Sequence, residues 1–159
     1  MRDVEGLMQE PVDGIMVRNV IMIRKDQTLE ALLTLLREKG ISGVPVIESD
    51  GTICGIVTEY DVMNFLSEKA KTRIKLPIEL LALERGERLN ALSMLEGFKS
   101  MKVSEIMKSP PITAPPTMKV RDVVALMVKH EVNRIPIVDK GKPVGIITRE
   151  DIIRALSEG

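Results

Sequence analysis

The sequence predicts an α+β protein built from two copies of one β-α-β-β-α unit, and two observations lead to that prediction. First, the chain repeats itself: residues 12–23 align with 103–114 at an offset of 91, and residues 55–62 align with 145–152 at an offset of 90. Second, each copy combines short apolar runs, typical of buried strands, with apolar residues at helical spacing. We therefore expect the same order of strands and helices in both copies.

The first strand and the first helix of each copy are predicted from apolar spacing. A short apolar run suits a buried strand, over Val20–Ile23 and over Ile112–Ala114. A helix is expected next, because apolar residues then recur three and four positions apart, at Leu29, Leu32, Leu33 and Leu36 and at Val120, Val123, Val124 and Met127. The candidate N-caps are Asp26 or Thr28 in the first copy and Thr117 in the second.

Two short strands and a final helix complete each copy. The strands are expected over Val44–Ile47 and Ile53–Val57, and over Ile135–Val138 and Val144–Ile147. The final helix begins near Thr58 or Thr148, because threonine is a natural N-cap. Proline lacks the N–H that a central strand donates, so Pro45 and Pro136 predict an edge of the sheet at the same point in both copies.

The repeat sets the predicted domain boundaries. Residues 9–68 form the first domain, residues 69–102 a connecting insert and residues 103–159 the second domain. Regularly spaced leucines in the insert predict two short amphipathic helices. The insert also carries a basic run, which we interpret either as a solvated connector or as a cationic docking surface: Lys69, Lys71, Arg73 and Lys75.

The composition excludes several classes of function. With 23 basic and 23 acidic residues the formal net charge is zero, which makes nucleic-acid binding improbable outside the basic insert. A single cysteine and a single histidine exclude an internal disulfide and metal sites built from several thiolates or imidazoles. No apolar run reaches the roughly 18 residues of a membrane span, and the acidic start is unlike a signal peptide. We therefore expect a cytoplasmic protein without membrane association.

The duplicated motifs point to a family. Each copy has an apolar-Pro-apolar step in one strand and the sequence Gly-Ile-apolar-Thr-x-x-Asp at the start of the final helix, over Gly55–Asp61 and Gly145–Asp151. This pattern resembles the CBS domain, named after cystathionine β-synthase, and two copies in tandem resemble the regulatory pair called a Bateman module. The resemblance covers about residues 9–68 and 101–159. It implies two units packed sheet to sheet with pseudo-twofold symmetry, leaving two clefts.

The resemblance also implies a ligand and the residues that bind it. Adenosine-containing ligands such as AMP, ADP, ATP or S-adenosylmethionine often occupy one or both clefts in this family. The carboxylate of the Thr-x-x-Asp motif would hold the ribose hydroxyls, and the stretch before the strand proline would border the adenine. The implied ligand-binding residues are Asn19, Val20, Ile21, Ile41, Ser42, Gly43, Pro45, Thr58 and Asp61, then Pro111, Ile112, Thr113, Val132, Asn133, Arg134, Pro136, Thr148, Arg149 and Asp151.

Elementary chemistry agrees with this assignment and leaves an alternative open. A carboxylate accepts hydrogen bonds from both hydroxyls of a ribose, and charge-assisted bonds are the stronger ones. Asp61 and Asp151 also stand where a plain first-turn carboxylate stabilises a helix dipole. Arg134 is the best candidate for a phosphate contact, because a guanidinium can bind a phosphate and the aligned residue of the first copy is the uncharged Gly43. The alternative is that Arg134 is a solvated surface arginine. Cationic side chains for a phosphate are expected only from the second copy.

We expect a regulatory module without catalysis, because the sequence lacks a nucleophile–histidine–acid set, a metal cluster and a Gly-rich phosphate loop. The adenosine nucleotide would be a regulatory ligand rather than a cofactor. The alternative is a dimerisation scaffold with degenerate clefts. Any regulated partner would be a separate polypeptide. A homodimer is expected through the final helices, whose apolar stripes are Val62, Phe65 and Leu66 and Ile152, Ile153 and Leu156.

Overall fold

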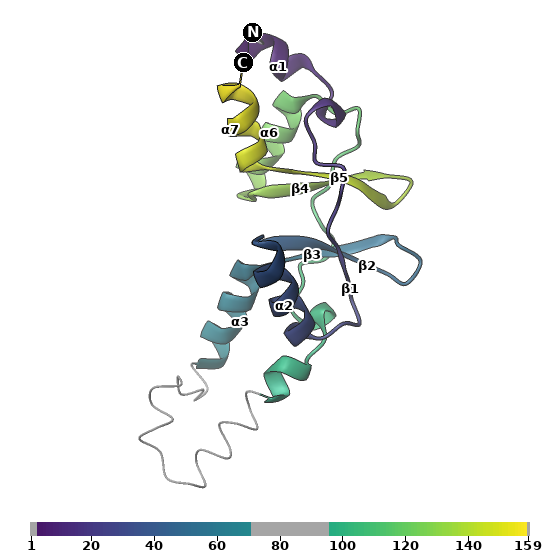
Figure 1. Cartoon of the computed structure of the whole chain (residues 1–159), viewed down its shortest axis with the longest axis vertical. Helices are drawn as coiled ribbons and strands as arrows, with labels where there is room; N and C mark the ends of the chain where they lie inside the picture. Colours follow the sequence, from purple (N-terminus) through teal and green to yellow (C-terminus); the bar gives the residue numbers. More distant parts are fainter. Residues whose placement is uncertain (1–2, 71–95, 159) are drawn as a thin grey trace, which may run out of the picture. The chain divides into compact units, whose positions relative to one another are not determined.

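The computed structural model describes residues 3–70 and 96–158, which belong to two compact units (Figure 1). Unit 1 comprises Met1–Met22, Ile47–Cys54 and Pro110–Gly159, and unit 2 comprises Ile23–Val46 and Gly55–Ser109. Each unit therefore contains most of one sequence copy together with the beginning of the other. The two helices predicted within the insert lie largely outside the described residues.

Unit 2 contains most of the first copy. Its elements are β1 (Ile23–Arg24), α2 (Leu29–Lys39), β2 (Gly43–Ile47), β3 (Ile53–Thr58) and α3 (Glu59–Ala70), and the strands form a sheet in the order β1-β2-β3. Helix α2 begins after a predicted cap, because Thr28 Oγ1 accepts a hydrogen bond from the Ala31 N–H at 3.2 Å. The buried apolar side chains of these elements include Leu29, Leu32, Leu36, Val44, Val46 and Val57.

Unit 1 contains the second copy and the N-terminal helix α1 (Val4–Gln9). Helix α1 packs against α6 (Val120–His130) and α7 (Arg149–Ser157). The strands β4 (Arg134–Asp139) and β5 (Lys142–Thr148) pair antiparallel, with Ile135 opposite Ile147. The core of this unit includes Val12, Ala114, Val120, Val123, Met127, Ile135, Ile137, Ile147 and Ile152.

The first residues of each copy pack in the unit of the other copy. Residues 12–17 belong to unit 1 and residues 103–109 belong to unit 2, and we call these two stretches the exchanged segments. Val17 exchanges both backbone hydrogen bonds with Ile146, each at 2.9 Å. Lys108 does the same with Ile56, at 2.8 and 3.0 Å. Each exchanged segment therefore adds one bridge to the last strand of the copy it packs against.

The predicted first strands are largely wrong. In the first copy only Ile23 of the expected range is in a strand, because the Val20 N–H donates to the Arg18 carbonyl at 3.0 Å and the chain bends there. In the second copy Ala114 forms a single parallel bridge with Ile137. Two prolines precede this expected strand and two follow it, and they provide no N–H groups for a longer ladder.

The predicted N-cap of α6 is also wrong. The helix begins at Val120, and its N-cap residue is Lys119 rather than Thr117. The Met118 N–H donates to the carbonyl of Pro115 at 3.0 Å, so Thr117 lies inside a turn before the helix starts. The first helical N–H, on Val120, donates at 2.9 Å to the carbonyl of Glu10, next to the exchanged segment. A distant piece of chain thus takes the place of a side-chain cap.

The predicted sheet edge is wrong at Pro45 and confirmed at Pro136, which lies in β4 of a two-stranded sheet. Pro45 lies in β2, which is the central strand of its sheet, so the predicted edge is wrong there. In unit 1 the Ala114 N–H donates to the carbonyl of Pro136 at 3.2 Å, and the Val138 N–H donates to Ala114 at 2.9 Å. This bridge needs no hydrogen from the proline nitrogen, which explains why Pro136 is tolerated beside a neighbouring segment.

Candidate functional site

The Thr58–Asp61 motif forms a closed set of hydrogen bonds at the start of α3. Asp61 Oδ2 accepts hydrogen bonds from the Thr58 N–H at 2.8 Å and from the Thr58 hydroxyl at 3.1 Å. The Asp61 N–H lies 3.4 Å from Thr58 Oγ1, its acceptor. Asp61 is only 6% exposed. These bonds tie the last residue of β3 to the first turn of α3, and they fix the buried carboxylate at this junction.

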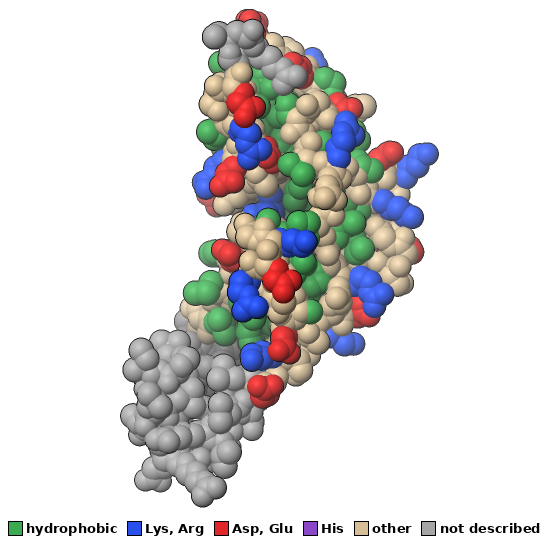
Figure 2. Space-filling model, viewed as in Figure 1, with side chains coloured by type: hydrophobic (Ala, Val, Ile, Leu, Met, Phe, Trp, Pro, Cys, Tyr) green, Lys and Arg blue, Asp and Glu red, His purple; other side chains and the backbone are tan. Residues whose placement is uncertain are grey.

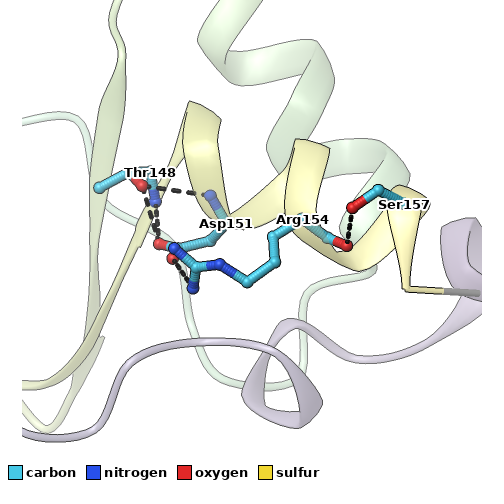
Figure 3. A network of polar contacts seen from close by, with 4 residues as sticks. All are labelled: Thr148, Asp151, Arg154 and Ser157. Atoms are coloured by element: carbon cyan, nitrogen blue, oxygen red, sulfur yellow. Dashed lines mark hydrogen bonds and ion pairs between the residues drawn. The ribbon is translucent and has the colours of Figure 1, made fainter.

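The Thr148–Asp151 motif repeats this geometry at the start of α7 (Figure 3). Asp151 Oδ2 accepts from the Thr148 N–H and from its hydroxyl, both at 2.8 Å, and the Asp151 N–H donates to Thr148 Oγ1 at 3.3 Å. Asp151 is buried as well. Both aspartates are therefore first-turn carboxylates, as in the alternative that the sequence left open, and both also take part in the helix cap.

Each buried carboxylate has its second oxygen paired with a cation. Lys108 Nζ lies 3.5 Å from Asp61 Oδ1, and Arg154 Nη1 lies 3.3 Å from Asp151 Oδ1. Both cationic side chains are more than half exposed, so they approach the carboxylates from the solvent side. A buried carboxylate needs such compensation, because transfer of a charge out of water is costly. In each carboxylate Oδ2 therefore accepts the hydrogen bonds of the cap, and Oδ1 is paired with the cationic group of an exposed side chain.

The backbone before each strand proline lies beside the start of the final helix. The first N–H of α3 donates to the carbonyl of Ser42 at 2.8 Å, and the Arg149 N–H donates to the carbonyl of Asn133 at 2.8 Å. Arg134 is the register partner of Thr148 across β4 and β5. The structure therefore brings Ser42 to the first motif, and Asn133 and Arg134 to the second.

The other predicted site residues differ in burial. Gly43, Pro45 and Pro136 are buried, and Asn19 and Arg149 are exposed. Residues 19–21 and residues 111–113 all belong to unit 1 and lie outside strands. Their part in a binding site stays a prediction. The half-buried members of the set are Val20, Ile21, Ile41, Pro111, Ile112, Thr113 and Val132.

Sequence reasoning missed both cations. Arg154 follows Asp151 by three residues, a spacing at which helical side chains meet, so the sequence did hold a signal for this pair. Lys108 gave no comparable signal, because its aligned residue in the first copy is Val17 and only the exchange of segments brings it to Asp61. It belongs to the second sequence copy, where we expected the cations, but it lies at the first motif.

The described part of the chain contains no cluster of three or more His, Cys, Asp and Glu side chains suited to a metal ion. Among the same residues, no helix is long and apolar enough to cross a membrane. Figure 2 shows Lys and Arg side chains interspersed with Asp and Glu on the face in view, where a nucleic-acid-binding surface would gather one sign.

Comparisons with known proteins agree with these features. The family model of the CBS domain matches residues 12–68 and 103–158. Uncharacterized protein MJ1426 of Methanocaldococcus jannaschii is 33% identical over 147 residues, covering 88% of each chain. The CBS domain of a CBS domain-containing membrane protein from Sphaerobacter thermophilus has a TM-score of 0.72 and 29% identity, and the match covers 94% of this chain and 90% of that one. The structure of CBSX2 in complex with AMP, a protein of Arabidopsis thaliana, has a TM-score of 0.70 at 23% identity, covering 94% and 97% of the two chains.

Two copies of an α+β unit, each ending in a helix capped by a Thr-x-x-Asp box, define a tandem pair of small repeated domains. This chain belongs to the CBS domain family. The match to both halves confirms the resemblance drawn from the duplicated motifs, and the solved neighbours confirm the α+β fold class.

Proposed function

We propose that this chain is a regulatory module that binds an adenosine-containing nucleotide at its Thr-x-x-Asp motifs. One observation carries the proposal: in both copies the cap uses only Oδ2 of the buried aspartate, while Oδ1 is paired with an exposed, movable cation. A ribose hydroxyl that donates to Oδ1 would leave the cap intact. A carboxylate held in this way is preorganised for a diol, and the bond is charge-assisted.

Membership of the CBS family and the AMP complex of CBSX2 support an adenosine ligand. The local backbone gives further support. The carbonyls of Ser42 and Asn133 accept from the first N–H groups of α3 and α7, so the chain before each strand proline runs past the carboxylate. In the proposal this stretch borders the adenine. Arg134, opposite Thr148, provides a guanidinium for a phosphate at the second motif.

In this proposal the module acts by binding and not by catalysis. A ligand at about 100 times its dissociation constant stabilises the state that binds it by about 2.7 kcal/mol. That free energy changes the protein's arrangement only to the extent that two arrangements differ in affinity for the ligand. In this proposal the module regulates a partner protein and acts as a homodimer in the cytoplasm.

Isothermal calorimetry and thermal unfolding with AMP, ATP, S-adenosylmethionine and adenosine test the proposal. We expect at least one of these ligands to bind and to raise the melting temperature, and the double variant D61A/D151A to lose that response. Asp122→Ala is the matched control, because Asp122 is a first-turn carboxylate of α6 that is about half exposed. A panel without any binding would favour the alternative, a dimerisation scaffold with degenerate clefts.

A further inference from the structure

The backbone of Lys108 is fixed by hydrogen bonds, whereas its ammonium group lies at the end of a largely exposed side chain. Both its N–H and its carbonyl are hydrogen-bonded to Ile56 of β3, so its Cα is fixed to the sheet. The ammonium lies 3.5 Å from Asp61 Oδ1 and 5.3 Å from the centroid of the Tyr60 ring. The second distance is within the range of a cation–π contact. The side chain is 59% exposed, and its four-carbon stem can swing without any change in the backbone.

In the second motif the buried aspartate is also paired with a cation, but the cation comes from a different position of the repeat. Val17 is aligned with Lys108 and cannot form an ion pair, and there Arg154 of α7 pairs with the aspartate instead. Conversely, Asn64 of α3 is aligned with Arg154, and there Lys108 provides the charge. Each motif thus has a cation paired with Oδ1 of its aspartate. Because the two cations come from different positions of the repeat, we infer that they belong to the motif and are not incidental surface pairs.

We propose that Lys108 is a specificity-determining residue of the first motif, selecting anionic adenosine nucleotides over uncharged adenosine; this inference rests on the proposed function. In this inference, a ribose hydroxyl that bonds to Asp61 Oδ1 takes the place of the ammonium on that oxygen. A nucleotide phosphate gives the displaced ammonium a new partner, so the charge pairing is regained. Adenosine offers no such partner, and its binding therefore carries the cost of the broken ion pair.

Tyr60 provides a spectroscopic readout confined to this motif. The chain has one tyrosine and no tryptophan, so tyrosine fluorescence reports on Tyr60 alone. AMP and adenosine are each titrated into the wild-type protein while the tyrosine emission is recorded. Calorimetry on the same samples gives the affinities. We expect AMP to change the emission as the ammonium leaves the ring, and AMP to bind more tightly than adenosine.

Three variants test the assignment, and a thermal melt first checks that each is folded. Lys108→Met keeps the length of the stem and removes the charge, so AMP affinity at the first motif should fall about tenfold, while adenosine affinity stays equal or rises. Lys108→Arg should restore the preference for AMP. Lys119→Met is the matched control: it removes an exposed lysine whose ammonium donates to Gln9 Oε1 at 3.0 Å, outside both motifs, and should leave the AMP affinity reported by Tyr60 unchanged.

The outcomes separate this inference from the proposed function. If Lys108→Met lowers the affinities for AMP and adenosine equally, or lowers neither, the specificity role of Lys108 is overturned and the proposed function stands. If the wild type binds neither AMP nor adenosine, by fluorescence or by calorimetry, the specificity role of Lys108 is overturned. The proposed function is overturned as well only if ATP and S-adenosylmethionine also fail to bind.

Discussion

Met16 packs directly onto Gly145, so closely that a Cβ added to the glycine would come within 2.8 Å of Met16 Cγ. The aligned pair repeats the contact in unit 2, where a Cβ on Gly55 would lie 2.6 Å from Met107 Sδ and 2.9 Å from the Lys108 carbonyl oxygen. In both cases the methionine comes from an exchanged segment and the glycine from the last strand of the other copy. The absence of a side chain at these two positions is what lets the exchanged segments approach.

Gly55→Ala should therefore lower the free energy of unfolding by about 1–3 kcal/mol, the usual cost of overpacking. The cost should exceed that of Gly145→Ala, because the Lys108 backbone oxygen cannot move aside as a methionine side chain can. Urea denaturation measures both. Gly97→Ala is the control, since nothing lies within 4 Å of its Cβ position and alanine favours a helix. Equal losses in all three variants would contradict the packing argument.

The capping boxes give a second stability prediction. Thr148→Ala removes the acceptor of the Asp151 N–H and one donor to Asp151 Oδ2, so the free energy of unfolding should fall by about 0.5–2 kcal/mol. Thr148→Ser keeps the hydroxyl and should recover most of that loss in the same urea experiment. A serine variant as unstable as the alanine variant would show that the methyl group, and not the cap, is what matters.

An exposed turn residue gives a pH prediction. The Thr52 N–H donates to Asp50 Oδ1 at 2.9 Å, and this bond is the main cause that lowers the pKa of Asp50 below 3.8, with the charge of Lys142 a smaller one. A carboxylate with a depressed pKa stabilises the fold above its unfolded pKa, and this stability is lost as the pH falls through the folded value. Asp50→Asn should therefore flatten the decline in stability below pH 3.8. Urea midpoints at neutral and acid pH measure the slope, and an unchanged acid decline would contradict the assignment.

The sequence predicted those features that depend on local spacing. The apolar faces of α2 and α6 are buried as expected at Leu29 and Val120, because helical periodicity is set within a few turns. The Thr148 cap was predicted for the same reason, since its partner lies three residues away.

Features that depend on the exchange of segments were not predictable in this way. The helix start at Val120 uses the carbonyl of Glu10, and Asp61 meets Lys108, and neither partner is near in sequence. The repeat itself gave no hint of Lys108, because the aligned residue Val17 is apolar. Prolines around Ala114 shortened an expected strand to a single bridge. An apolar run alone does not reveal how many N–H donors it can offer to a neighbour.

The predicted phosphate contact of Arg134 can be tested with one pair of ligands. Arg134→Ala should lower the affinity for AMP about tenfold, as expected for the loss of a charged hydrogen bond. The affinity for adenosine should barely change. Calorimetry measures both constants, and Arg121→Ala provides the control, because that arginine is exposed and paired with Asp122 on α6. Equal losses for AMP and adenosine would rule out a phosphate role and point to a structural one.

The last prediction concerns association of two copies of the chain. Of the apolar stripes expected on the final helices, Val62 and Ile152 are buried within their own units, and Phe65 stacks on Phe98 with ring centroids 5.7 Å apart. The surface of α7 still exposes Ile153 and Leu156, with Ile153 59% exposed.

Exposed apolar side chains grouped on one helix are typical of an interaction surface. We therefore expect a homodimer by light scattering at micromolar concentration, and Ile153→Glu should shift it toward the monomer, because a buried unpaired carboxylate opposes association. Val128→Glu is the matched control, since Val128 is 74% exposed on α6, a helix outside the predicted interface. A monomeric wild type would defeat the prediction, and so would a dimer that tolerates Ile153→Glu as well as Val128→Glu.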